Sequence, residues 1–180
     1  RRLGVNFGAP GDRVAPDGTL WLEYPYVGGP TPKVEIELDA GGDVDLGAVA
    51  VRKLCFARHS SRVRGDGLKW VAASGIEAAA DIAIKLAGSR SAPQTYTVAL
   101  HFAEPGPAGK GRRTFDVALQ GETVLRGLDI AAETGGALTP LVKTFRKVAV
   151  KDKLRIALRQ GPASEFPPVL CGVQIVQEDP

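Results

Sequence analysis

The sequence predicts an all-β fold in which antiparallel strands form a sandwich or a barrel. Three observations predict it. Apolar and polar residues alternate with a period of two over several segments. The chain has 22 glycines and 13 prolines in 180 residues, which implies many tight turns and therefore many short strands. Apolar residues at helical spacing are nearly absent, which excludes a mainly helical fold.

In the first half, short strand candidates are separated by clusters of Gly, Pro and Asp that are typical of turns. The strand candidates cover residues 3–7, 19–23, 34–38 and 53–58. Residues 76–86 are the one place where a helix competes, because the run Glu-Ala-Ala-Ala-Asp favours helix. Ile82, Ile84 and Leu86 alternate, however, and glycines bracket the segment, so a strand is favoured.

The second half has the clearer pattern. Tyr96, Val98 and Leu100 alternate with smaller or polar residues, as expected of a half-buried strand. The basic, β-branched segment 143–150 loses its parity part of the way along, which predicts a β-bulge. The predicted strands are residues 96–103, 114–119, 123–125, 143–150, 154–159 and 169–176.

Length and charge exclude several classes of protein. A chain of 180 residues suits one domain of ordinary size, and its lack of Met suggests a fragment of a larger protein. No apolar run approaches the length of a membrane-spanning helix, so membrane insertion is not expected. The net charge of +3 is mild, and no basic stripe with interleaved aromatics is present, so a nucleic-acid partner is not expected either.

The two cysteines, Cys55 and Cys171, leave two alternatives open. They are far apart in the sequence and belong to no metal-binding motif. They can be buried thiols that pack as small apolar side chains, or a disulfide that ties an early strand to the last one.

A set of matched positions between residues 96 and 130 gives the chain a resemblance to malectin and the malectin-like carbohydrate-binding modules. A strand ending in His-Phe-Ala-Glu is followed by a loop, then by Phe-Asp-Val-x-Leu-x-Gly and Leu-Asp-Ile. The matched positions after the loop are Phe115, Asp116, Val117, Leu119, Gly121, Leu128, Asp129 and Ile130.

The resemblance implies a fold, a function and a setting. It implies that residues 1–180 form a single malectin-like domain, an antiparallel jelly-roll β-sandwich of the galactose-binding-domain-like type. It also implies a non-catalytic module that recognises an oligosaccharide or polysaccharide. Such modules are secreted, periplasmic or displayed at the cell surface, often beside other domains of the same parent chain.

The resemblance also points to candidate sugar-binding residues. Glu104 ends the tetrad, and Glu165, beside Phe166, is the nearest counterpart of an acidic residue that malectin uses before its last strand. In malectin a pair of aromatics follows the first of these glutamates. Here residues 105–109 are Pro-Gly-Pro-Ala-Gly, so that part of the family's site is missing.

Further candidates come from the chemistry of sugar recognition, which combines an aromatic face with side chains that bond hydroxyl groups. Trp21, Tyr24 and Tyr26 lie in a segment bounded by Pro and Gly, and His59 lies in a polar, basic loop. The alternative for Trp21 is a place in the core, since aromatics act mainly through burial. The same argument makes Trp70 a core residue, and the resemblance makes His101 part of the scaffold.

Neither catalysis nor a bound metal is predicted. The chain has no Gly-x-Ser-x-Gly elbow, and neither cysteine stands in a nucleophile signature. A structural Ca²⁺ bound by aspartates in Gly-rich turns is the minor alternative, because such aspartates more often bond their own backbone. Those aspartates are Asp12, Asp17, Asp39, Asp43 and Asp45.

The predicted function is therefore carbohydrate binding through loop aromatics and carboxylates. The alternative is a structural or protein-interaction domain that has kept the fold and lost the sugar site, which the missing aromatics after Glu104 favour. A third hypothesis is an accessory domain whose neighbour in the parent chain supplies the ligand.

Overall fold

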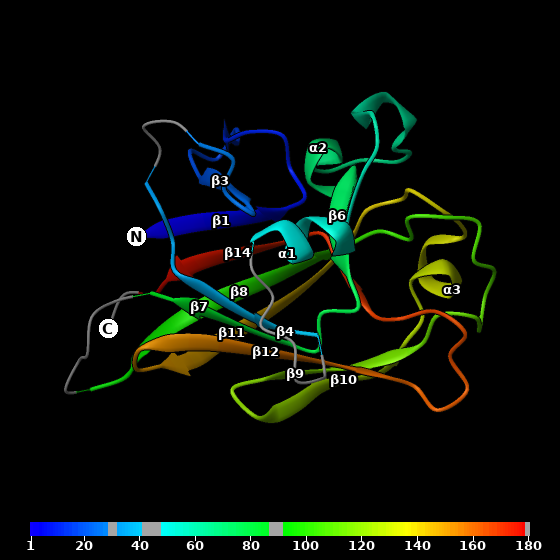
Figure 1. Ribbon diagram of the computed structural model, residues 1–180. Helices are drawn as coiled ribbons and strands as arrows, with labels where there is room; N and C mark the ends of the chain where they lie inside the picture. The colour runs from blue at the N-terminus through cyan, green and yellow to red at the C-terminus, as the bar shows by residue number, and fades with distance from the viewer. Residues whose placement is uncertain (29–31, 41–47, 87–91, 179–180) are drawn as a thin grey trace.

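The computed structural model describes residues 1–28, 32–40, 48–86 and 92–178, and β-strands dominate it (Figure 1). Short helical segments lie between some of the strands. In chain order the elements are β1 (Arg2–Phe7), β2 (Arg13–Val14), β3 (Leu20–Tyr24), β4 (Ile36–Asp39), α1 (Ala48–Leu54), β5 (Cys55–Ala57), η1 (Ser60–Arg62), α2 (Lys69–Ala72), β6 (Ser74–Glu77), β7 (Asp81–Lys85), β8 (Gln94–Phe102), β9 (Phe115–Leu119), β10 (Glu122–Leu128), α3 (Ile130–Thr134), β11 (Leu141–Val150), β12 (Lys153–Gln160), β13 (Val169–Leu170) and β14 (Gly172–Gln177).

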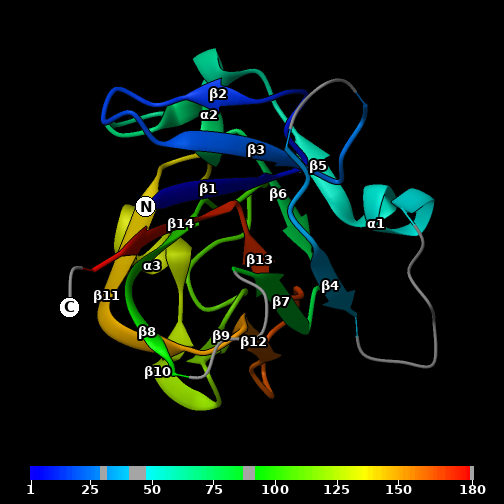
Figure 2. The ribbon, with the colours of Figure 1, turned by 90° about the vertical axis from the view of Figure 1, so that its left-hand side faces the viewer.

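Two large sheets make up the sandwich. One has the strand order β11-β8-β14-β1-β3-β2 and the other β10-β9-β12-β7-β4. A small third sheet has the order β13-β6-β5, and Figure 2 places it beside the two larger ones. The paired strands are antiparallel except β1 and β3, which run parallel. The predicted antiparallel jelly-roll β-sandwich is confirmed.

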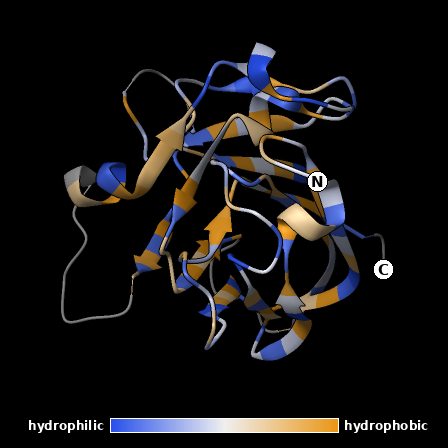
Figure 3. Cartoon of the chain, turned by 90° about the vertical axis from the view of Figure 1, so that its right-hand side faces the viewer, coloured by the Kyte–Doolittle hydropathy of each residue, from blue (hydrophilic) through white to orange (hydrophobic). Residues whose placement is uncertain are grey.

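The period-two pattern explains how the two sheets share a core. Val5, Val173 and Leu100 come from neighbouring strands of the six-stranded sheet, and all three are buried in one apolar cluster. Phe115 and Leu158 join the same cluster from the five-stranded sheet. Figure 3 shows the alternation directly, because orange and blue residues follow one another along the strands. Burial of this apolar surface is the main stabilising contribution to the fold.

Local features follow the sequence closely in the second half and less closely in the first. The segment that could have been a helix forms β6 and β7 instead. The bulge predicted in residues 143–150 appears as a register shift between Phe145 and Val148, where Lys147 has a φ of 57°. The candidate at residues 53–58 is only partly a strand, because α1 continues to Leu54 before β5 begins.

The two cysteines are free thiols, Cys55 half-buried and Cys171 buried. Burial raises the pKa of Cys55 to about 11 and the pKa of Cys171 to about 12. Both thiols therefore stay protonated near neutral pH and pack as apolar side chains. Of the two alternatives, the disulfide is not the one formed.

None of the helices in the described part of the chain combines the length and the apolar character that a membrane crossing requires.

The outer face of the six-stranded sheet carries a second buried layer. Gly4 of β1 lies opposite Trp21 of β3, and a Cβ built on Gly4 would come within 2.1 Å of the indole. A Cβ on Gly172 of β14 would come within 2.9 Å of the same ring and 2.8 Å of Val71 in α2. The two glycines thus leave the space in which the indole lies between the sheet and α2.

Replacing Gly4 with alanine should destabilise the domain. The new methyl group would overlap the Trp21 ring, and both the sheet and α2 limit how far the ring can move. We expect a loss of about 1–3 kcal/mol in the free energy of unfolding, the usual cost of overpacking a core. Urea denaturation measures this loss. Gly106→Ala, where an added Cβ would meet nothing within 4 Å, is the matched control.

Candidate functional site

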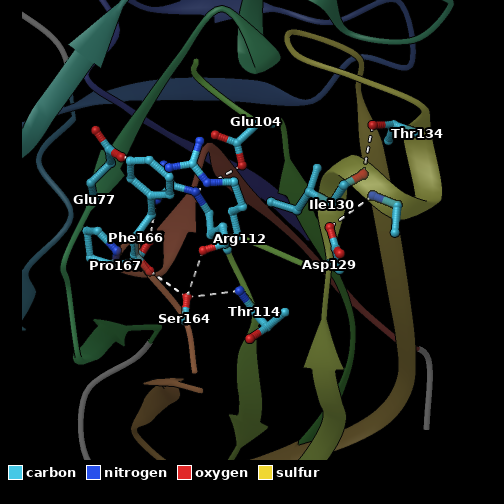
Figure 4. A network of polar contacts seen from close by, with 12 residues as sticks. Glu77, Glu104, Arg112, Thr114, Asp129, Ile130, Thr134, Ser164, Phe166 and Pro167 are labelled. Carbon is cyan, nitrogen blue, oxygen red and sulfur yellow. Dashed lines mark hydrogen bonds and ion pairs between the residues drawn. The ribbon is translucent and has the colours of Figure 1, made fainter. Parts of the chain in front are cut away.

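The residues expected to bind sugar fall in separate regions of the structure. Glu104, Glu165 and Phe166 come together in a loop cluster formed by the segment between β8 and β9 and the segment between β12 and β13. Figure 4 shows this cluster, with Glu104, Arg112 and Phe166 close to one another. Trp21, Tyr24, Tyr26 and His59 lie elsewhere.

Arg113 is the centre of the loop cluster. Its side chain is only 4% exposed, and its Nε donates to Glu104 Oε2 at 2.9 Å. Its Nη2 donates to Glu77 Oε1 at 2.9 Å, and its Nη1 donates to the carbonyl oxygen of Pro167. One guanidinium therefore connects β6, the end of β8 and the loop before β13.

The buried position of Glu104 argues against a direct role in sugar binding. The side chain is 1% exposed and points at Arg113, so it has no surface to offer a ligand. Burial raises the pKa of Glu104, and the attraction of Arg113 opposes that rise. Glu104 is therefore a structural partner of Arg113. If Glu104 turned outward, the buried charge of Arg113 would be left uncompensated.

Glu165 and Phe166 are nearer the surface, but both already have partners. Glu165 Oε2 accepts from Arg112 Nη2 at 2.6 Å, and this hydrogen bond lowers the pKa of the carboxyl. The Phe166 ring has the guanidinium carbons of Arg112 and Arg113 5.1 and 5.3 Å from its centroid. A sugar could reach the ring only by displacing a cation–π contact.

Trp21 is buried, which agrees with the alternative of a place in the core. The residue is 1% exposed, with its ring edge-on to Trp70 and His101 at centroid distances of 5.6 and 5.0 Å. Trp21 and Glu23 share one side of β3 and pair with Gly4 and Asn6 of β1. That side is covered by α2 and is not exposed to solvent.

The two tyrosines line a small cavity of about 100 Å³ near the end of β3. Tyr24 is half-buried, packs edge-on against Phe7 at 5.8 Å and directs its hydroxyl to the Ile36 carbonyl at 3.4 Å. The Tyr26 ring has Lys33 Nζ 4.7 Å from its centroid. These contacts leave little free aromatic face for a sugar.

His59 belongs to a cavity of about 170 Å³ that carries the most suitable chemistry for a sugar. Its walls come from the loop after β1, the turn between β5 and η1, and the junction of α2 with β6. These elements lie near one end of β1 in Figure 1, although they are far apart in the sequence. We call it the Trp70 cavity; its polar and aromatic lining residues are Asn6, Arg13, Arg58, His59, Ser60, Trp70 and Ser74.

Trp70 packs at the border between the core and the Trp70 cavity. It packs against the core through its edge-on contact with Trp21, as expected. It is only half-buried, however, and also lines the cavity, where the Arg13 guanidinium carbon lies 5.8 Å from the ring centroid. The lining joins an indole to hydrogen-bonding side chains, the combination that sugar recognition requires.

A hydrogen-bonded pair fixes the polar floor of the Trp70 cavity. Asn6 is 3% exposed; its Oδ1 accepts from Ser74 Oγ at 3.2 Å, and its Nδ2 lies 3.5 Å from the Trp70 carbonyl oxygen. Above the floor, His59 Nδ1 lies 2.7 Å from Ser61 Oγ and 3.3 Å from the Ser61 backbone nitrogen. Both side chains are therefore held in place before any ligand arrives.

Of the aspartates considered for calcium, Asp12 and Asp17 accept hydrogen bonds from the backbone. Asp17 accepts from the backbone and hydroxyl of Thr19, and Asp12 accepts from the Glu23 backbone at 2.8 Å. Asp39 lies opposite Asp81 in the pairing of β4 with β7. Asp43 and Asp45 lie outside the described residues. In the described part of the chain, no three acidic, His or Cys side chains group as metal ligands.

Comparison with known proteins supports the resemblance. Residues 88–161 match the family model of the malectin domain. No curated protein sequence matches the chain. Among solved structures, the ANXUR1 extracellular domain from Arabidopsis thaliana is similar with a TM-score of 0.69 and 14% identity, over 99% of this chain and 48% of that one.

Two further structures resemble the chain. The β-glucuronidase of Bacteroides uniformis has a TM-score of 0.64 and 14% identity, over 99% of this chain and 18% of the enzyme. A chain of the complex of the plant peptide RALF23 with FER and LLG2 has a TM-score of 0.67 and 19% identity, over 98% and 48%. The present chain thus spans about a fifth of the enzyme and about half of the plant chains. Residues 88–161 thus match the malectin domain, and the chain as a whole shares the galactose-binding-like β-sandwich fold of these structures.

Proposed function

We propose that the domain is a non-catalytic carbohydrate-binding module whose ligand enters the Trp70 cavity. The observation that carries the proposal is the half-buried indole of Trp70, which lies beside the fixed side chains of Asn6, Ser74 and His59. The indole can cover the apolar face of a pyranose, and the exposed His59 imidazole can bond one of its hydroxyl groups. Asn6 and Ser74 are each 3% exposed and bond each other, so they hold the cavity floor in place. A cavity of about 170 Å³ suits one sugar unit, such as a chain end, better than a long polysaccharide segment.

The cavity replaces the loop cluster as the proposed site. In the loop cluster, Glu104 is buried against Arg113, Glu165 is paired with Arg112, and Phe166 lies beside both guanidinium groups. In the Trp70 cavity, His59 keeps its proposed role from the sequence, and Trp70 takes the role first given to Trp21. The setting proposed with this function is a secreted, periplasmic or cell-surface protein in which the domain is one module of a longer chain.

Replacing Trp70 with alanine should weaken sugar binding about tenfold or more, because it removes the one indole among the described residues that line the cavity. Isothermal titration calorimetry over a panel of mono- and disaccharides measures this effect. Trp70→Phe keeps an aromatic ring and should retain most of the affinity. Thermal unfolding of both variants shows whether the contact with Trp21 is still made.

Two results would contradict the proposal. If Phe166→Ala abolishes binding while Trp70→Ala does not, the sugar site is in the loop cluster. If the folded wild-type chain binds no member of a broad glycan panel, the domain acts in protein interaction. A precedent for that second function is the similar chain found in complex with a peptide and a partner protein.

A further inference from the structure

We infer that the Trp70 cavity selects an acidic sugar, that is, a pyranose carrying a carboxylate or a sulfate group. The inference rests on the proposed function, since it assumes that the ligand is a sugar, and it adds the charge of that sugar. It depends on the polar groups that line the cavity and on the absence of carboxylates among them.

The first argument is the charge of the lining. Arg13 and Arg58 contribute guanidinium groups, and His59 contributes an imidazole. None of the residues lining the cavity is acidic. The basic character continues beyond the wall, because residues 52–64 contain five Lys and Arg and no Asp or Glu. An anion entering here would meet positive potential on several sides.

The second argument is that these cations are not already neutralised. Neither Arg13 nor Arg58 forms an ion pair with any carboxylate in the described ranges, whereas Arg112, Arg113 and Arg159 all do. The Arg13 guanidinium lies over Trp70, and Arg58 Nη1 donates to the Ala57 carbonyl at 3.0 Å. The nearest acid in sequence, Asp12, accepts a hydrogen bond from the Glu23 backbone and does not line the cavity.

The third argument is the balance of donors and acceptors. A neutral sugar presents hydroxyl groups that donate as well as accept, so its sites usually contain carboxylate acceptors. Here the amide oxygen of Asn6 already accepts from Ser74, and the two arginines are donors only. An excess of donors fits a ligand that brings its own acceptor oxygens, and guanidinium groups bind carboxylate and sulfate in a fork geometry.

The position of Arg13 adds a geometric reason. Its guanidinium carbon lies over the Trp70 ring, 5.8 Å from the centroid, so a pyranose that packs on the indole would contact the guanidinium. An acidic substituent on the edge of that ring would therefore point toward the guanidinium. Trp70 would pack against the pyranose ring, and Arg13 would bind its charged substituent.

The test compares matched neutral and acidic sugars by calorimetry on the 180-residue chain. The pairs are glucose with glucuronate, galactose with galacturonate, and N-acetylglucosamine with its 6-sulfate. We expect each preferred acidic member to bind at least about tenfold more tightly than its neutral partner at low salt, and to lose much of that advantage at roughly 0.5 M salt. The carboxylate and sulfate arms show which acidic group is recognised.

Variants connect the charge preference to the cavity. Arg13→Gln and Arg58→Gln should each reduce binding of the acidic sugar about tenfold while leaving the neutral sugar nearly unaffected. Arg155→Gln, an exposed guanidinium on β12 that lines a different cavity, is the matched control and should change neither.

The possible results distinguish a failure of this inference from a failure of the proposed function. If neutral and acidic sugars bind equally, or if Arg13→Gln leaves the preference intact, this inference is wrong and the proposed function stands. If neither class binds to the folded chain, the proposed function itself fails. If inorganic sulfate or acetate competes as well as the acidic sugars, the cavity is an anion site without selectivity for a sugar, and the inference is also overturned.

Discussion

Replacing Arg113 with methionine is expected to lower the free energy of unfolding by about 3–5 kcal/mol. The variant leaves Glu104, which is 1% exposed, without its ion-pair partner, and it also removes the hydrogen bonds from Arg113 to Glu77 and to the Pro167 carbonyl. A buried carboxylate without compensation is among the most destabilising features that a point mutation can create. Urea or thermal unfolding at neutral pH measures the loss.

The neighbouring residue supplies the matched control. Arg112 also pairs with a glutamate, but its side chain is 47% exposed and that of Glu165 is 56% exposed. Arg112→Met should therefore leave the unfolding midpoint almost unchanged, since exposed ion pairs contribute little. Equal effects of the two substitutions would mean that the Arg113 network is not a buried structural element.

The pH dependence of Arg113→Met gives an independent check. Burial already raises the pKa of Glu104, and Arg113 is the main group that opposes the rise. Without Arg113 the pKa of Glu104 rises further, so the folded variant binds a proton more strongly than the unfolded chain does. Its stability deficit should therefore shrink as the pH falls from neutral toward the ordinary carboxyl range, because a protonated Glu104 no longer carries a buried charge.

The sequence predicted the strands well wherever period-two alternation was strong. Residues 96–103 and 154–159 became β8 and β12 because each strand has one face in the shared core. The helical segments α1, α2 and α3 were not predicted, since at four to seven residues they are too short to show a helical apolar stripe. Their positions depend on tertiary packing, such as that of Val71 against Gly172.

The site was harder to predict because the exposure of a side chain on a strand depends on which elements cover that face of the sheet. Trp21 and Glu23 share one side of β3, and the sequence could not show that α2 covers that side of the sheet. A usable signal was present in Gly4 and Gly172, since glycines inside neighbouring strands often mark a large side chain lying across them. Trp70 then takes the more accessible position, and the sequence gives no comparable signal for it.

The family resemblance predicted the fold and brought Glu104, Glu165 and Phe166 to one place, as the loop cluster shows. The resemblance could not predict that Arg112 and Arg113 pair with the two glutamates and lie beside the Phe166 ring. A sequence motif indicates which backbone segments lie together in the fold. The neighbouring side chains determine whether that region is accessible to a ligand.

Acid should destabilise the domain through His101, and this effect is expected to reach about 3 kcal/mol. The imidazole is 8% exposed, its ring centroid lies 5.0 Å from that of Trp21, and its Nε2 has no hydrogen-bond partner in the described chain. Burial lowers the pKa of His101 from 6.5 to about 4. The folded protein therefore holds this residue neutral at a pH where the unfolded chain protonates it.

The sign of the pH effect follows from this difference in proton binding. Above pH 6.5 the imidazole is neutral in both states and has no linked effect. Between pH 6.5 and about 4, His101 is protonated in the unfolded chain but not in the folded protein, so stability falls as the pH falls. His101→Phe keeps an aromatic ring against Trp21 and removes the titration, so the stability difference between variant and wild type should grow in favour of the variant across this window. His59→Gln, at an exposed position, should follow the wild type. Parallel pH profiles for His101→Phe and the wild type, measured by urea denaturation, would show that the imidazole is solvated in the fold.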